Sequence, residues 1–155
     1  MSIDADNFSV ERRGRLLEAR VWALDDHDVA DRYSRALAER AASAPFGEAP
    51  VLCADHRFAE VYPQPVTDRL LALFEQMNTR LARIAIVVHP EQATFFMQLN
   101  RIVREARFDK RQVFRDIDEA LAFLALDLDA TDVANARHFL QVGPKPGVRG
   151  VTRGT

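Results

Sequence analysis

Two short apolar runs separated by one helical pattern constrain the fold of this chain most strongly. The runs cover residues 51–54 and 84–88, and neither alternates between apolar and polar residues as a half-exposed strand does. Between them, apolar side chains recur at helical spacing after Pro65, a residue that suits a first helical turn. Two buried strands joined through a helix run parallel with a right-handed crossover, so the pattern predicts a parallel core to the sheet.

The flanking segments extend this layout in both directions. Residues 7–13 and 15–24 surround Gly14 and predict an antiparallel hairpin, whose second arm has one apolar face, expected to be buried, and one mixed face, expected to be half-exposed. The predicted fold is therefore α/β, with a mixed four- to five-stranded sheet opened by an N-terminal β-hairpin, about four helices and an extra C-terminal helix. The expected helices cover approximately residues 29–41, 65–81, 89–106 and 116–124, followed by 132–141. Asp116, with Glu119 three residues further on, resembles a capping box at the start of the fourth.

Length and composition indicate one globular unit with a short tail. The chain has 155 residues, which is the size of a single domain, and we expect that domain to cover residues 1–142. Residues 143–155 are mostly Gly, Pro, Val, Thr and basic residues, which predicts a disordered basic tail. The formal net charge of −2 predicts no nucleic-acid partner.

The chain shows no signal for export or for membrane insertion. Its first residues are acidic and lack an apolar core, and the longest apolar run is too short to cross a bilayer. We therefore expect a cytoplasmic protein. The third helix carries Arg101, Arg104 and Arg107 on or near one face, and Lys110 and Arg111 follow just beyond it. This basic stretch favours a solvated helix face but leaves an anion or RNA patch open.

The common catalytic and nucleotide-binding motifs are missing. No serine lies in a GxSxG turn, and neither GxGxxG nor GxxxxGK[ST] occurs. The single cysteine, Cys53, falls within an apolar strand, where burial is the expected state of a thiol. We therefore predict a protein that is not an enzyme and needs no cofactor.

Polar residues at the predicted strand ends keep one enzymatic alternative open. His27, Asp55, His56 and His89 each follow a predicted strand, and the carboxyl ends of parallel strands share one edge of a sheet. Imidazoles and a carboxylate there could bind a metal ion or transfer protons near neutral pH. Polar loop residues also gather at such edges without any function, so no metal site is predicted and a metal-dependent enzyme stays an alternative.

Three segments resemble the STAS family, which is named for sulfate transporters and anti-sigma-factor antagonists. They are the opening Phe8-Ser9-Val10-Glu11, the strand and exit at 51–57, and the closing strand and helix start at 112–124. The resemblance is to the divergent stand-alone bacterial branch. It implies a regulatory module that docks to a protein partner, often a kinase that phosphorylates a serine or threonine at a helix start.

The phosphorylation signature of such domains is absent here. The family's Asp-Ser-x-Gly turn does not occur before the second helix, and the nearest hydroxyl is that of Thr67. A phosphate on Thr67 would lie at a helix N-terminus, which favours negative charge. A threonine at that position is also an ordinary helix-start residue, so Thr67 is a possible phosphoacceptor only.

The exit of the strand at 51–54 supplies the predicted docking edge, which extends to the helix after it. Arginine and tyrosine are frequent at interface hot spots, which favours a binding role for Arg57 and Tyr62. The structural alternative is that Asp55 caps backbone amides and Arg57 pairs with a neighbouring carboxylate. The predicted partner-binding residues are Asp55, His56, Arg57, Phe58, Tyr62 and Thr67.

The third helix carries more large apolar residues than one sheet-facing side requires. Phe95, Phe96, Met97 and Leu99 span more than one helical face. A carrier or sensor of a lipid-like apolar molecule, bound between the second and third helices, is therefore a further alternative. Core packing with a self-association patch explains the pattern too, and Trp22 on the hairpin could join a homodimer surface.

Overall fold

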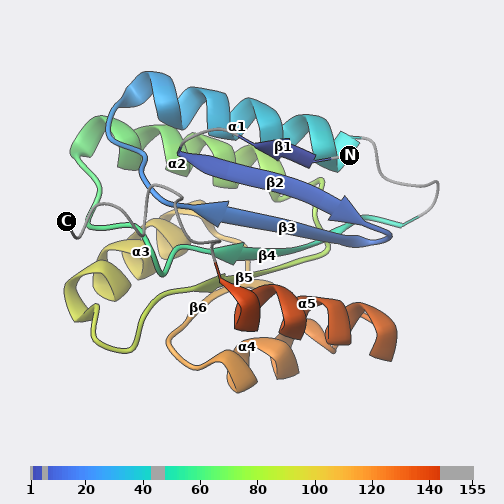
Figure 1. Ribbon diagram of the computed structural model, residues 1–155. Coiled ribbons are helices and arrows are strands. Elements are labelled where there is room, and N and C mark those ends of the chain that lie inside the picture. Colours follow the sequence, from blue (N-terminus) through green and yellow to red (C-terminus); the bar gives the residue numbers. More distant parts are fainter. Residues whose placement is uncertain (1, 5–6, 43–47, 144–155) are drawn as a thin grey trace.

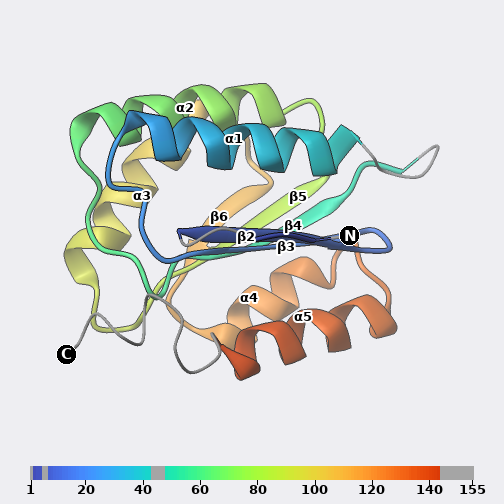
Figure 2. The same ribbon diagram turned by 45° about the horizontal axis from the view of Figure 1, so that its top comes forward.

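The computed structural model describes residues 2–4, 7–42 and 48–143, and it is shown in Figures 1 and 2. Of the predicted tail, only Gly143 belongs to these residues, so the expected disorder of 144–155 lies outside the described chain.

One mixed sheet organises the described chain and confirms the predicted α/β class. Its six strands follow one another in sequence order, antiparallel across the first three and parallel from the third to the sixth. Gly14 has a φ of 60° and forms the hairpin turn, because a residue without a Cβ adopts this left-handed conformation easily. The strands are β1 (Ser2–Asp4), β2 (Phe8–Arg13), β3 (Leu16–Val21), β4 (Val51–Asp55), β5 (Arg83–Val87) and β6 (Arg111–Phe114).

Three of the five helices in the described chain begin at a carboxylate cap, whereas the helices that start at Gln64 and Ala93 have no side-chain cap. Asp26 accepts a hydrogen bond from the backbone of Val29, and Asp116 accepts one from Glu119, as its spacing predicts. The helices are α1 (His27–Ala42), α2 (Gln64–Met77), α3 (Ala93–Ala106), α4 (Ile117–Leu124) and α5 (Ala130–Val142).

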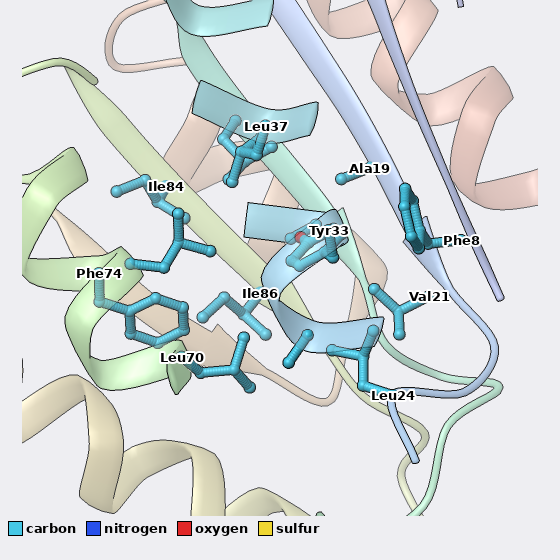
Figure 3. Packing of buried hydrophobic residues seen from close by; sticks show 14 of the residues in the cluster. Phe8, Ala19, Val21, Leu24, Tyr33, Leu37, Leu70, Phe74, Ile84 and Ile86 are labelled. Atoms are coloured by element: carbon cyan, nitrogen blue, oxygen red, sulfur yellow. The ribbon is translucent and has the colours of Figure 1, made fainter. Parts of the chain in front are cut away.

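Helices α1, α2 and α3 cover one face of the sheet, as Figure 2 shows with the sheet nearly edge-on. Their apolar stripes pack on the strand residues that point to this face, which alternate along each strand. Figure 3 shows Tyr33 and Leu37 of α1 and Leu70 of α2 gathered over Val21 and Ile86 of the sheet. This layer holds most of the core.

Helices α4 and α5 cover the opposite face, over a smaller cluster that includes Leu16, Cys53 and Leu140. This second layer buries β3 along its whole length, so the expectation of a half-exposed mixed face was wrong. Glu18 and Arg20, on that face, are 3% and 8% exposed. Trp22 is buried as well and does not lie on an open face of the hairpin.

Within the described ranges, every helix lacks the length or the apolar character that crossing a bilayer requires.

Candidate functional site at the exit of strand β4

Asp55 ends β4 and is the centre of a buried ion cluster. Arg20 of β3 donates from Nε to Oδ2 of Asp55 at 3.0 Å, because the parallel register places these two residues opposite each other. Arg57 donates from Nε and Nη2 to the two carboxylate oxygens at 2.9 and 3.0 Å, and its backbone N–H donates to Oδ1 at 3.0 Å. We call Arg20, Asp55 and Arg57 the Asp55 cluster.

The arginines keep the Asp55 carboxylate ionised although its side chain is fully buried. Burial alone would raise the pKa of Asp55, but the hydrogen bonds and charge of Arg57, with the charge of Arg20, outweigh it and lower that pKa. One carboxylate between two guanidinium groups leaves the cluster with a net charge of about +1.

The Asp55 cluster also holds the C-terminal end of α5 against the sheet. Arg57 donates from Nη2 to the carbonyl of Leu140 at 2.6 Å, and Arg20 donates to the carbonyl of Phe139 while stacking on its ring. The last carbonyls of a helix have no partners within the helix and carry partial negative charge, so cations stabilise them. Asp55 and Arg57 therefore have a structural role, because their cluster holds the end of α5 against the edge of the sheet.

His56 points to the other face of the sheet, into the larger core. Its Nδ1 lies 2.7 Å from the hydroxyl of Tyr62, and both rings pack near Phe95. Burial lowers the pKa of His56 to about 4, against an attraction from Asp55 that acts in the opposite direction. The imidazole is therefore neutral at pH 7.

Two glutamines of the α3 region fix the loop between β4 and α2. The side chain of Gln98 accepts from the backbone N–H of Tyr62 and donates to its carbonyl, both at 2.8 Å. Gln92 donates to the carbonyl of Ala59 at 2.7 Å. These side-chain amides therefore bond the loop backbone on both sides of Glu60 and Val61.

Gln98→Ala is expected to lower the free energy of unfolding by about 1–2 kcal/mol, because two hydrogen bonds to half-buried backbone groups are lost. Urea unfolding followed by circular dichroism measures the change. Gln141→Ala on the exposed side of α5 is the matched control and should change stability by less than about 0.5 kcal/mol. Equal effects of the two substitutions would contradict the assigned role of Gln98.

The other predicted binding residues lie around this loop. Phe58 is half-buried under the guanidinium of Arg57, with 5.3 Å between the Arg57 carbon and the ring centre. Thr67 is 9% exposed and donates its hydroxyl to the carbonyl of Gln64 within the first turn of α2. Phosphorylation of Thr67 stays a prediction, and it would require the hydroxyl to leave this bond.

The structure brings the six predicted residues to one edge of the sheet but buries four of them: Asp55, His56, Tyr62 and Thr67. In the loop between β4 and α2 the exposed positions are Glu60, Val61 and Pro63, and Val61 is 50% exposed. Val61 was not predicted from the sequence, because a single valine in an irregular loop gave no signal. Sequence reasoning also missed Arg20, whose position on the mixed face of its strand was the only available sign.

The strand-end residues considered for metal binding do not share one environment. The ring of His56 lies in the core, whereas His27 and His89 are exposed at the start of α1 and after β5. In residues 2–4, 7–42 and 48–143, no three His, Cys, Asp or Glu side chains form a group that could hold a metal ion.

The space between α2 and α3 is small and polar. A pocket of about 60 Å³ lies there, with Gln64, Asp68, Arg101 and Glu105 in its walls. An apolar cavity lies beneath α1 and α2, and its volume of about 10 Å³ is roughly that of one water molecule. Neither volume accommodates a lipid chain.

The basic stretch that begins on α3 and continues to the start of β6 loses Arg111 to burial. This side chain is 4% exposed, donates to the carbonyl of Phe74 and to Oδ1 of Asn78, and lies between the rings of Phe74 and Phe108. Burial lowers the pKa of Arg111 to about 10. Arg111 therefore anchors the end of α2 and does not belong to a surface patch.

Comparison with protein-family models gave no match, and comparison with curated protein sequences gave none either.

Proposed function

We propose that this chain is a non-enzymatic, cytoplasmic regulatory module of the STAS-like type, which binds a protein partner through the exposed rim of the loop between β4 and α2. The rim consists of Glu60, Val61 and Pro63. The observation that carries the proposal is the half-exposed apolar side chain of Val61 on a loop fixed by Gln92 and Gln98.

A fixed apolar side chain suits a docking surface, because little conformational entropy is lost when the partner binds. A second exposed apolar residue is Met97 on α3, which is 69% exposed. It immediately precedes Gln98, whose side chain bonds the backbone next to Val61. Methionine is common on surfaces that bind protein helices. The resemblance in strand and helix order supports the same class of function.

The docking segment of the proposal is the one predicted from sequence, from Asp55 to Thr67, but its contact positions differ. Substitution of Arg57 or Tyr62 would disturb the Asp55 cluster or the core, and lost binding would then have two explanations. Val61 is the better position at which to test binding, because its exposed side chain can be changed without disturbing the Asp55 cluster or the core.

Val61→Glu is expected to reduce partner capture at least about tenfold, which corresponds to the loss of a modest hot spot of about 1.4 kcal/mol or more. Quantitative mass spectrometry of proteins co-purified from the native host measures the loss. Leu126→Glu is the matched control, since Leu126 is 69% exposed in the turn after α4. Unchanged capture by a folded Val61→Glu variant would contradict the proposal.

A further inference from the structure

A second feature of the strand edge is a cleft of about 380 Å³ beside the ends of β5 and β6. Its volume lies within the range of small-molecule sites, roughly 300–1,000 Å³, and in α/β sheets such sites collect at the carboxyl ends of parallel strands. Its walls include Arg57, His89, Arg115 and Asp116, and apolar surface comes from Pro90 and Ile117. The cleft adjoins the Asp55 cluster but lies apart from Val61, which does not line it.

Arg115 supplies the principal donor of this cleft. Its guanidinium stacks on the ring of Phe96, with 4.2 Å from the central carbon to the ring centre. Within the described ranges no carboxylate or carbonyl accepts a hydrogen bond from it, although the side chain reaches the cleft. Stacking fixes the plane of a guanidinium while its N–H groups stay available, which favours bidentate recognition of a planar anion.

His89 and Arg57 provide further donors. Nδ1 of His89 accepts a hydrogen bond from the backbone of Glu91 at 3.2 Å, so a neutral His89 carries its proton on Nε2 and can donate from there. Arg57 bonds Asp55 and Leu140 through Nε and Nη2, and Nη1 takes no part in these bonds.

The charged side chains that line the cleft, counted with their hydrogen-bonded partners, sum to about one positive unit. The Asp55 cluster contributes about +1, Arg115 contributes +1, and Asp116 contributes −1 while it caps α4. Asp118 is compensated by Arg137, 3.1 Å away. A singly charged anion therefore balances the site, whereas a phosphate dianion would leave excess negative charge beside Asp116 and Asp118.

We propose that this cleft binds a small organic carboxylate, whose charged end pairs with Arg115 and whose apolar body lies against Pro90 and Ile117. This ligand site goes beyond the proposed docking function. The carboxylate matches the planar donors of Arg115 and receives a further hydrogen bond from Nε2 of His89.

Amide NMR of the uniformly ¹⁵N-labelled full chain, titrated with sodium benzoate at constant ionic strength and pH 7.5, tests the proposal. Saturable shifts are expected at the amides of His89, Glu91, Ile117 and Asp118. Inorganic phosphate at the same concentrations should bind more weakly at these positions. Arg115→Gln is expected to weaken benzoate binding at least about tenfold, since one charge-assisted pair is lost.

Arg104→Gln, on the exposed face of α3, is the matched control and should bind benzoate as the unsubstituted chain does. Val61→Glu should also retain benzoate binding, which separates this site from the docking rim. Absence of saturable shifts, equal weakening by Arg104→Gln and Arg115→Gln, or tighter binding of phosphate than of benzoate would each overturn the proposal.

Discussion

Asp55→Asn is expected to lower the free energy of unfolding by about 3–5 kcal/mol, the range for breaking a buried ion pair by removing one partner. The buried guanidinium group of Arg20 and the partly buried one of Arg57 would lose their shared carboxylate, and neither can lose its proton to escape burial. The carbonyls of Phe139 and Leu140 remain as acceptors, so the C-terminal end of α5 should loosen first. Guanidinium chloride unfolding followed by circular dichroism gives the change in free energy.

Asp118→Asn is the matched control for this experiment, because Asp118 pairs with Arg137 at the surface with its side chain 81% exposed. It should cost less than about 1 kcal/mol. Hydrogen exchange of the last turn of α5 adds a local readout, and protection there should fall in Asp55→Asn. A cost equal to that of Asp118→Asn would show that the Asp55 cluster does not stabilise the fold.

The second large effect concerns acid and His56. Burial lowers the pKa of His56 to about 4 in the folded protein. Between pH 6.5 and 4 the His56 imidazole therefore stays neutral in the folded state but takes up a proton in the unfolded state. Acid therefore favours the unfolded chain. The contribution of neutral His56 to the free energy of unfolding is fully present above about pH 6.5 and is lost as the pH falls toward 4. The loss is on the order of 3 kcal/mol.

Urea unfolding at intervals between pH 7.5 and 4.5 measures this loss, and comparison with His56→Gln isolates it. The variant should lose most of the slope, whereas His89→Gln, at an exposed histidine, should retain it. An unchanged slope in His56→Gln would contradict the assignment of the slope to His56.

Glu18 acts in the opposite direction over part of this range. Burial raises the pKa of Glu18 against the hydrogen bond and charge of Arg13, so its contribution is present at low pH and is lost as the pH rises through the raised pKa. Because the parent chain and His56→Gln both contain Glu18, this contribution cancels in their difference. Asp55, whose pKa is lowered, contributes stability that is lost only at still lower pH.

The local part of this fold could be predicted from the sequence. Unbroken apolar runs predicted the parallel strands β4 and β5, and carboxylate spacing predicted the cap at Asp116, since both depend on neighbours in the chain. The strand β1 was not predicted, because three residues are too few to show a periodic pattern.

The candidate site depends on contacts between distant segments, and these could not be predicted. The pairing of Arg20 with Asp55 requires the register of β3 against β4, which short apolar runs do not specify at the level of single residues. The burial of Arg20 and Glu18 requires α5 to lie over them. Only two residues of α5 are buried, Ala136 and Leu140, so its sequence shows no broad apolar face that would predict this packing. The inward position of Tyr62 depends on Phe95 of α3, 5.1 Å away between ring centres.

Site-specific photo-crosslinking tests the proposed docking rim most directly. A photoreactive phenylalanine analogue is placed at position 61, and separately at position 126, in chains expressed at native level in the native host. Leu126 is also exposed and serves as the surface reference. The proposal predicts a discrete adduct of one additional protein at position 61, absent at position 126. No adduct at position 61, or the same adducts at both positions, would contradict it.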